Sequence, residues 1–116
     1  MSTATSMALR VGKVDRILDA LGDSTRRRII RLLSARPMSV SDLAKPLGIT
    51  VTAVTQHLRI LQSCALLTSH KNGRVRMCSL DTSGFEVLEH WVRESRISWE
   101  RRLDRLGSIL DEDDQT

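Results

Sequence analysis

The sequence predicts a mainly α-helical domain with one small β-hairpin, and three observations lead to this fold class. Apolar side chains recur at helical spacing in several separate stretches. Alternating runs flank Asn72-Gly73, the dipeptide that most strongly signals a tight hairpin turn. The length of 116 residues is that of a single domain. We therefore expect one domain of about five helices and a two-stranded hairpin.

The first two helices are predicted over 9–21 and 24–35. The apolar face of the first is made of Val14, Ile17, Leu18 and Leu21. Gly22 ends this helix, as glycine commonly does. Asp23 or Ser24 then offers a side-chain oxygen that can cap the second helix. The buried set of the second helix is Ile29, Ile30, Leu32 and Leu33.

Two further helices are joined by a short glycine-containing segment. The third begins near Ser39, which forms a capping-box pattern with Asp42, and ends before Gly48. The fourth spans about 51–63, with Thr50 as its N-cap. A helix of about eight residues, a tight joint and a longer helix have the proportions of a helix-turn-helix.

The fourth helix has two chemically distinct edges at about 100° per residue. Its buried edge is made of Val51, Val54, Leu58 and Leu61, and its opposite edge of Thr52, Gln56, Arg59 and Ser63. The polar edge carries no acid, and its side chains are of the types that recognise base edges in a major groove. An ordinary amphipathic helix with a solvated face is the alternative.

The hairpin spans 66–80 and is basic. Lys71 lies at its tip, and Arg74 and Arg76 are expected on one strand face because they alternate with Val75 and Met77. A basic hairpin directly after a helix-turn-helix is a "wing", placed to contact phosphates. A small ribbon that only closes the core is the alternative.

The last helix carries an apolar stripe from Phe85 to Leu110, about 39 Å long. A small domain is narrower than this, so part of the stripe needs a partner, most simply a second copy. The residues 1–8 are expected to form a disordered tail, 9–110 the folded domain, and 111–116 a frayed acidic tail.

Charge is segregated along the chain, whose formal net charge is +4. Residues 1–80 hold thirteen basic and four acidic side chains, whereas residues 81–116 hold five basic and ten acidic ones. Because residues 1–80 are basic and residues 81–116 are acidic, we expect only residues 1–80 to bind a polyanion.

Several classes are disfavoured by composition. No run approaches the roughly 20 apolar residues of a membrane span, and the first dozen residues lack a signal-peptide core, so we expect a cytoplasmic protein. Two cysteines, Cys64 and Cys78, do not form a disulfide framework. We expect no enzyme, because no phosphate loop, nucleophile elbow or triad arrangement is present.

The stretches 21–33, 39–67 and 72–80 resemble the ArsR-type winged-helix regulators over about residues 9–110. The most specific part of this resemblance is Thr55-Gln56-His57-Leu58 through Leu66-Leu67. It implies a homodimeric transcription factor, mostly repressing, that binds double-stranded DNA at a palindromic operator. The resemblance departs at Ala65, where the family commonly has glycine, and a left-handed Ala65 would cost roughly 1 kcal/mol.

We assign site residues on this combined basis. Base readers are expected to be Thr52, Ala53, Gln56 and Arg59. DNA-backbone contacts are expected from Ser39, Thr50, Thr55, His57, Lys71, Arg74 and Arg76. The dimer interface is expected to contain Val14, Ile17, Leu88, Trp91, Val92, Trp99, Leu103 and Leu106. His57 alternatively supports packing, and the run Arg26-Arg27-Arg28 is expected to make structural pairs rather than DNA contacts.

We expect neither a cofactor nor a metal. The third helix lacks the thiolates with which family sensors bind metal, and Glu86, His90 and Glu94 fall opposite the apolar stripe, where a zinc site would lack a fourth ligand. A small-molecule effector at the dimer interface and control by protein level alone both stay open. A protein-interaction module of the same fold is the alternative to a DNA-binding regulator.

Overall fold

The computed structural model describes the backbone of residues 3–114 and the side chains of residues 12–112. In this part of the chain lie five helices and three strands, as follows: α1 (Thr3–Leu21), α2 (Ser24–Ala35), β1 (Met38–Ser39), α3 (Val40–Leu47), α4 (Val51–Ser63), β2 (Leu67–Asn72), β3 (Val75–Leu80) and α5 (Thr82–Asp114). The mainly helical winged helix-turn-helix prediction is confirmed. The strand β1 was not expected, because two residues carry no readable periodicity.

The helix starts follow the predicted caps. The side chains of Asp23, Ser39 and Thr50 each accept the backbone N–H of the third residue that follows, over 3.0–3.1 Å. Asp23, rather than Ser24, is the cap of α2. Each cap satisfies one N–H that the first helical turn leaves without a partner. The Thr50 cap lies in the α3–α4 joint and fixes the point at which α4 begins.

The sheet is antiparallel in the order β1-β3-β2. Its hairpin is displaced by one residue from the prediction: Asn72 pairs with Val75, and Gly73 and Arg74 form the loop. Gly73 has φ +66°, a conformation that favours glycine. Arg74 consequently lies in the turn, and the expectation that it shares a strand face with Arg76 is wrong.

The core lies where α1, α2, α3 and α4 meet the sheet. Its fully buried members include Ile17, Ile29, Leu43, Val54, Leu61, Leu66, Leu67 and Cys78. On α4 the predicted Val54, Leu58 and Leu61 are buried, whereas Val51 is 49% exposed at the start of the helix. Val14 and Ile17 are buried by the protomer itself, at 5% and 2% exposure, so they have no area left for the interface in which they were expected.

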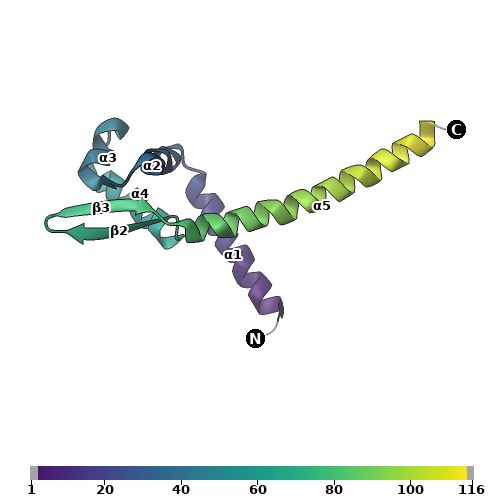
Figure 1. The fold of residues 1–116 in the computed structure, drawn as a ribbon, viewed down its shortest axis with the longest axis horizontal. Helices are drawn as coiled ribbons and strands as arrows, with labels where there is room; N and C mark the ends of the chain where they lie inside the picture. The colour runs from purple at the N-terminus through teal and green to yellow at the C-terminus, as the bar shows by residue number, and fades with distance from the viewer. Residues whose placement is uncertain (1–2, 115–116) are drawn as a thin grey trace.

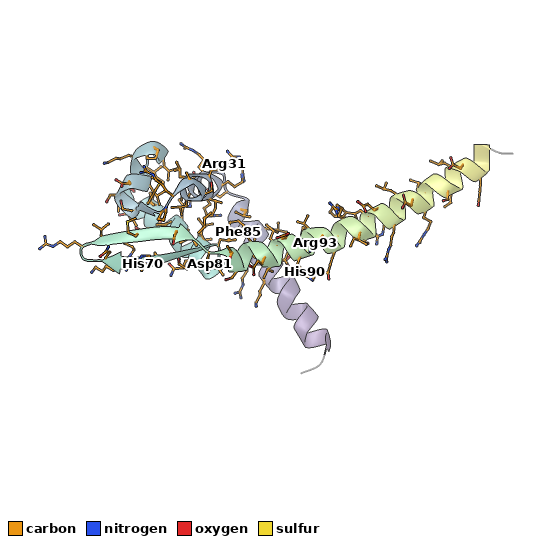
Figure 2. The ribbon with its side chains drawn as sticks, viewed as in Figure 1. Arg31, His70, Asp81, Phe85, His90 and Arg93 are labelled. Carbon is orange, nitrogen blue, oxygen red and sulfur yellow. The ribbon has the colours of Figure 1, made fainter. Side chains whose placement is uncertain are left out.

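Helix α5 leaves the body of the protein and runs far beyond it (Figure 1). Its first turns pack on the core through Phe85, Val87 and Leu88. The rest of its apolar stripe has no cover, because Trp99 and Leu103 are 53% and 66% exposed. Figure 2 shows His90 and Arg93 on the part of α5 that leaves the body.

The expected terminal tails differ from the described backbone. Helix α1 begins at Thr3 and α5 continues to Asp114, so residues 3–8 and 111–114 are helical. The remainder of the two expected tails, 1–2 and 115–116, lies outside the described residues. No helix within the described chain is long and apolar enough to span a membrane.

Candidate nucleic-acid interface

The recognition-helix candidate α4 is held by its joint to α3. Gly48 ends α3 at φ +66°, and its N–H donates to the carbonyls of Ala44 and Lys45. Leu43 and Leu47 on α3 are buried with Leu58 of α4 in the same core. These contacts fix the orientation of α4 from one side and leave its other side free.

The free side of α4 carries the predicted base readers. Thr52, Gln56 and Arg59 are exposed, and Ala53 is half-buried. Together they form a polar edge with one cation and no acid, opposite the buried Val54–Leu58–Leu61 edge. The geometry suits insertion into a major groove, which admits a helix.

The three predicted backbone-contact hydroxyls differ in the hydrogen bonds they already make. Ser39 and Thr50 accept backbone N–H groups as caps, so their own protons stay available to a phosphate. The Thr55 hydroxyl donates to the Val51 carbonyl over 2.9 Å. Thr55 has therefore already used the only proton that it could give to a phosphate oxygen.

His57 lies against Arg26, 31 positions away in sequence. Arg26 Nη1 and His57 Nδ1 are 3.4 Å apart, and His57 is half-buried. A guanidinium only donates, so the ring accepts at Nδ1 and the neutral ring keeps its proton at Nε2. Both expectations for His57 are thus compatible: one nitrogen serves packing, and the other can donate to a phosphate.

The run Arg26-Arg27-Arg28 makes structural pairs, as predicted. Arg26 Nε donates to the Ala20 carbonyl over 2.6 Å, and Arg27 Nη1 donates to the Leu21 carbonyl over 2.8 Å. Arg28 Nη2 donates to the Pro46 carbonyl over 2.9 Å. These cations meet free carbonyls at the C-terminal ends of α1 and α3, where the helix dipole is negative.

The cations of the wing are arranged differently from those of α2. Lys71 and Arg76 face each other directly across β2 and β3, and both are exposed. Like charges at opposite positions of a ladder destabilise it. In the described chain no ion pair involves Arg59, Lys71, Arg74 or Arg76. These four cations are therefore available to an external polyanion.

One connection between the wing and α4 was not predicted from the sequence. Ser69 Oγ donates to Gln62 Oε1 over 3.3 Å and accepts from Arg76 Nη1 over 3.1 Å. Gln62 falls between the buried and polar edges of α4, so the helical wheel alone gave it no role. The sequence pattern that could have revealed this connection is the strand alternation, which places Ser69 and Lys71 on the same face of β2.

The acidic and thiol groups add no chemistry to this surface. His90 Nε2 pairs with Glu94 Oε1 over 2.9 Å as an exposed i, i+4 contact, and no group of three metal-ligating side chains exists among the described residues. Cys64 and Cys78 are both free. Burial raises the pKa of the Cys78 thiol, which is fully buried, and keeps this side chain in its neutral form.

A helix-turn-helix with an exposed polar edge, followed by a hairpin whose cations have no acidic partner among the described residues, defines a winged-helix DNA-binding protein. Comparison with known proteins agrees with this assignment to the winged-helix DNA-binding proteins. A family described as a helix-turn-helix domain matches residues 21–70. The HTH-type transcriptional regulator Rv2034 of Mycobacterium tuberculosis is 34% identical over 97 residues, which cover 84% of this chain and 88% of that protein.

Two further relatives extend this comparison. A crystal structure of an ArsR family transcriptional regulator is 35% identical, has a TM-score of 0.72, and aligns over 77% of this chain and 92% of the other. The transcriptional repressor SdpR of Bacillus subtilis is 28% identical over 79 residues, which cover 68% of this chain and 88% of SdpR. This chain therefore belongs to the ArsR family of winged helix-turn-helix transcriptional regulators.

Proposed function

We propose that the protein acts as a homodimeric repressor on a palindromic operator in duplex DNA. The observation that carries this proposal is the outward polar edge of α4, beside a wing whose cations have no acidic partner within the described part of the chain. The direction of regulation is taken from the relative SdpR, which is named a repressor. Binding to an operator that overlaps a promoter would exclude the polymerase, and the protein would act in the cytoplasm, where that DNA lies.

Each protomer would contribute two kinds of contact. Thr52, Ala53, Gln56 and Arg59 read base edges, with Gln56 suited to adenine and Arg59 to guanine. His57, Lys71, Arg74 and Arg76 contact phosphates, together with the capping hydroxyls Ser39 and Thr50. The phosphate contacts set affinity and orientation, whereas the base contacts set sequence preference.

The exposed stripe of α5 supports the homodimer. Val92, Trp99, Leu103, Leu106 and Leu110 are each about half exposed or more in the protomer. Such a continuous apolar surface is what an isologous interface buries. Leu88 and Trp91 are half-buried at the point where α5 leaves the body, so they lie at the edge of the proposed interface. Val14 and Ile17 are excluded from it.

The test measures DNA binding and oligomeric state on the full chain. Fluorescence anisotropy with a random-sequence duplex, at low and at moderate salt, should show binding that weakens steeply as salt rises. Analytical ultracentrifugation should give a dimer for the wild type and a larger monomer fraction for Leu103→Glu. Ser108→Glu, on the opposite side of α5, is the matched control and should stay dimeric. Absence of duplex binding even at low salt would favour a protein-interaction module.

A further inference from the structure

The Ser69 side chain connects three elements at the base of the wing. It lies on β2, donates to Gln62 near the end of α4 and accepts from Arg76 on β3. Gln62 follows Arg59 by three residues on α4, so the two side chains are neighbours on that helix. Ser69 thus links a phosphate-binding candidate, Arg76, to the α4 residue one turn after the base-reading candidate Arg59.

Strand alternation places Lys71 and Arg76 on the α4 side of the hairpin. Leu67, Ser69 and Lys71 point to one face because side chains alternate along a strand. Cys78 and Arg76 point to the same face from β3, opposite Ser69 and Lys71. Leu67 and Cys78 are fully buried, so this face is the one turned toward the core and α4.

The wing is attached to the body beyond its base on both strands: Met77 of β3 pairs with Ser39 of β1, and Ser69 of β2 bonds to Gln62 of α4. The base of the hairpin is fixed by buried Leu66 and Leu67. Among the described side-chain hydrogen bonds, none links residues 70–76 to an element outside the hairpin. The tip around Gly73 extends away from the helices (Figure 1). The bond from Ser69 to Gln62 is therefore the outermost described side-chain link between the hairpin and α4.

The same hydroxyl orients Arg76. Lys71 lies directly opposite Arg76, and the repulsion between them would otherwise spread the two cations apart. Ser69 Oγ accepts one of the five guanidinium N–H groups and leaves four for an anion. Strand pairing places Lys71 and Arg76 on one face, and the Ser69 bond holds the Arg76 guanidinium there, so that a single stretch of sugar-phosphate backbone can contact both cations.

We propose that Ser69 is a positioning residue that sets the angle of the wing to α4, so that Lys71 and Arg76 contact the DNA backbone flanking the groove that α4 enters. This inference rests on the proposed DNA-binding function. It assigns a role to a hydroxyl that need not touch DNA, and it makes the phosphate contact of Arg76 depend on the Gln62–Ser69 bond.

The test compares Ser69→Ala with two matched variants on a duplex that the wild type binds. Ser69→Ala should weaken binding about 3- to 10-fold, the range expected for a lost hydrogen bond of this kind. Ser69→Thr keeps the hydroxyl and should bind within about twofold of wild type. Thr68→Ala removes a similar exposed hydroxyl contact, to Ser79 at 3.3 Å on the other face of the hairpin, and should leave binding unchanged.

A double-mutant cycle separates positioning from a general loss of stability. Arg76→Ala should cost clearly less in the Ser69→Ala background than in the wild type, because Arg76 is no longer held in place. Urea unfolding should show that Ser69→Ala and Thr68→Ala are equally stable. The inference is overturned if Ser69→Ala binds like Thr68→Ala, or if Arg76→Ala costs the same in both backgrounds. A wild type that binds no duplex would instead contradict the proposed function itself.

Discussion

The N–H of Gly84 donates to the carbonyl of Ala65 over 2.8 Å, which joins the first turn of α5 to the turn that follows α4. A Cβ added at Gly84 would lie 2.5 Å from the Cys64 carbonyl oxygen and 2.6 Å from that of Ala65. Ala65 itself has φ +57°, the left-handed conformation that lets the chain turn from α4 into β2. The start of the proposed dimerisation helix is therefore packed against the turn that follows the proposed reading helix.

Gly84→Ala is expected to destabilise the protein by about 1–3 kcal/mol, because the new methyl group would meet rigid backbone oxygens that cannot move aside. Urea unfolding followed by circular dichroism measures this change. Gly107→Ala is the matched control, because a Cβ at Gly107 meets nothing within 4 Å. A Gly84→Ala variant as stable as Gly107→Ala would show that α5 does not approach α4 this closely.

Ala65→Gly is expected to change stability in the opposite direction. Glycine adopts positive φ without the Cβ clash that alanine has there, which is worth about 1 kcal/mol. Part of this gain is offset by the greater freedom of glycine in the unfolded chain. The same unfolding experiment should give a higher urea midpoint for Ala65→Gly. A lower midpoint would contradict a left-handed Ala65.

Arg28 and Arg74 are both exposed arginines of the basic residues 1–80, but we expect Arg28 to affect stability and Arg74 to affect DNA binding. Arg28→Ala removes the hydrogen bond to the Pro46 carbonyl and should lower stability by about 1 kcal/mol. Arg74→Ala should leave stability unchanged and should make the negative slope of log K against log salt shallower by about one. Anisotropy at several salt concentrations and urea unfolding measure the two effects. An unchanged salt slope for Arg74→Ala would remove that side chain from the phosphate contacts.

Asp23 gives the fold a pH dependence at the acidic end. The backbone N–H of Arg26, which the carboxylate accepts, holds the pKa of Asp23 below its usual value. A lowered folded-state pKa means that the stabilisation is present above the unfolded pKa, about 3.9, and is lost as the pH falls through the lower folded value. Asp23→Asn keeps a capping oxygen without a titrating group. Its unfolding midpoint should fall less than that of the wild type between pH 5 and 3 (roughly the range in which aspartate protonates); equal falls would contradict the cap.

Periodicity predicted the parts of this fold that consist of long regular elements. The buried edge of α4 at Val54, Leu58 and Leu61 followed from 100° spacing, and the wing followed from alternation around Asn72-Gly73. The exposed stripe of α5 followed from the same spacing, because its length exceeds any cover the domain can supply.

The remaining features depend on tertiary contacts that a single sequence does not reveal. The strand β1 is too short to show a period, and it exists because β3 provides its hydrogen bonds. Arg26 meets His57 only because α2 packs on α4. Val14 and Ile17 share an apolar face whether that face turns to the core or to a second copy, and only the packing of α1 shows that it turns to the core.

The central claim, that the Thr52–Gln56–Arg59 edge of α4 reads DNA sequence, is tested most directly by selecting duplexes from a random pool with the wild type and with Gln56→Ala. The wild type should select a palindrome whose half-sites lie about one helical turn apart. Gln56→Ala should lose preference at one matching position in each half-site and bind the wild-type site more weakly by about 1–3 kcal/mol. The same motif and the same affinity from both proteins would show that another surface recognises the DNA.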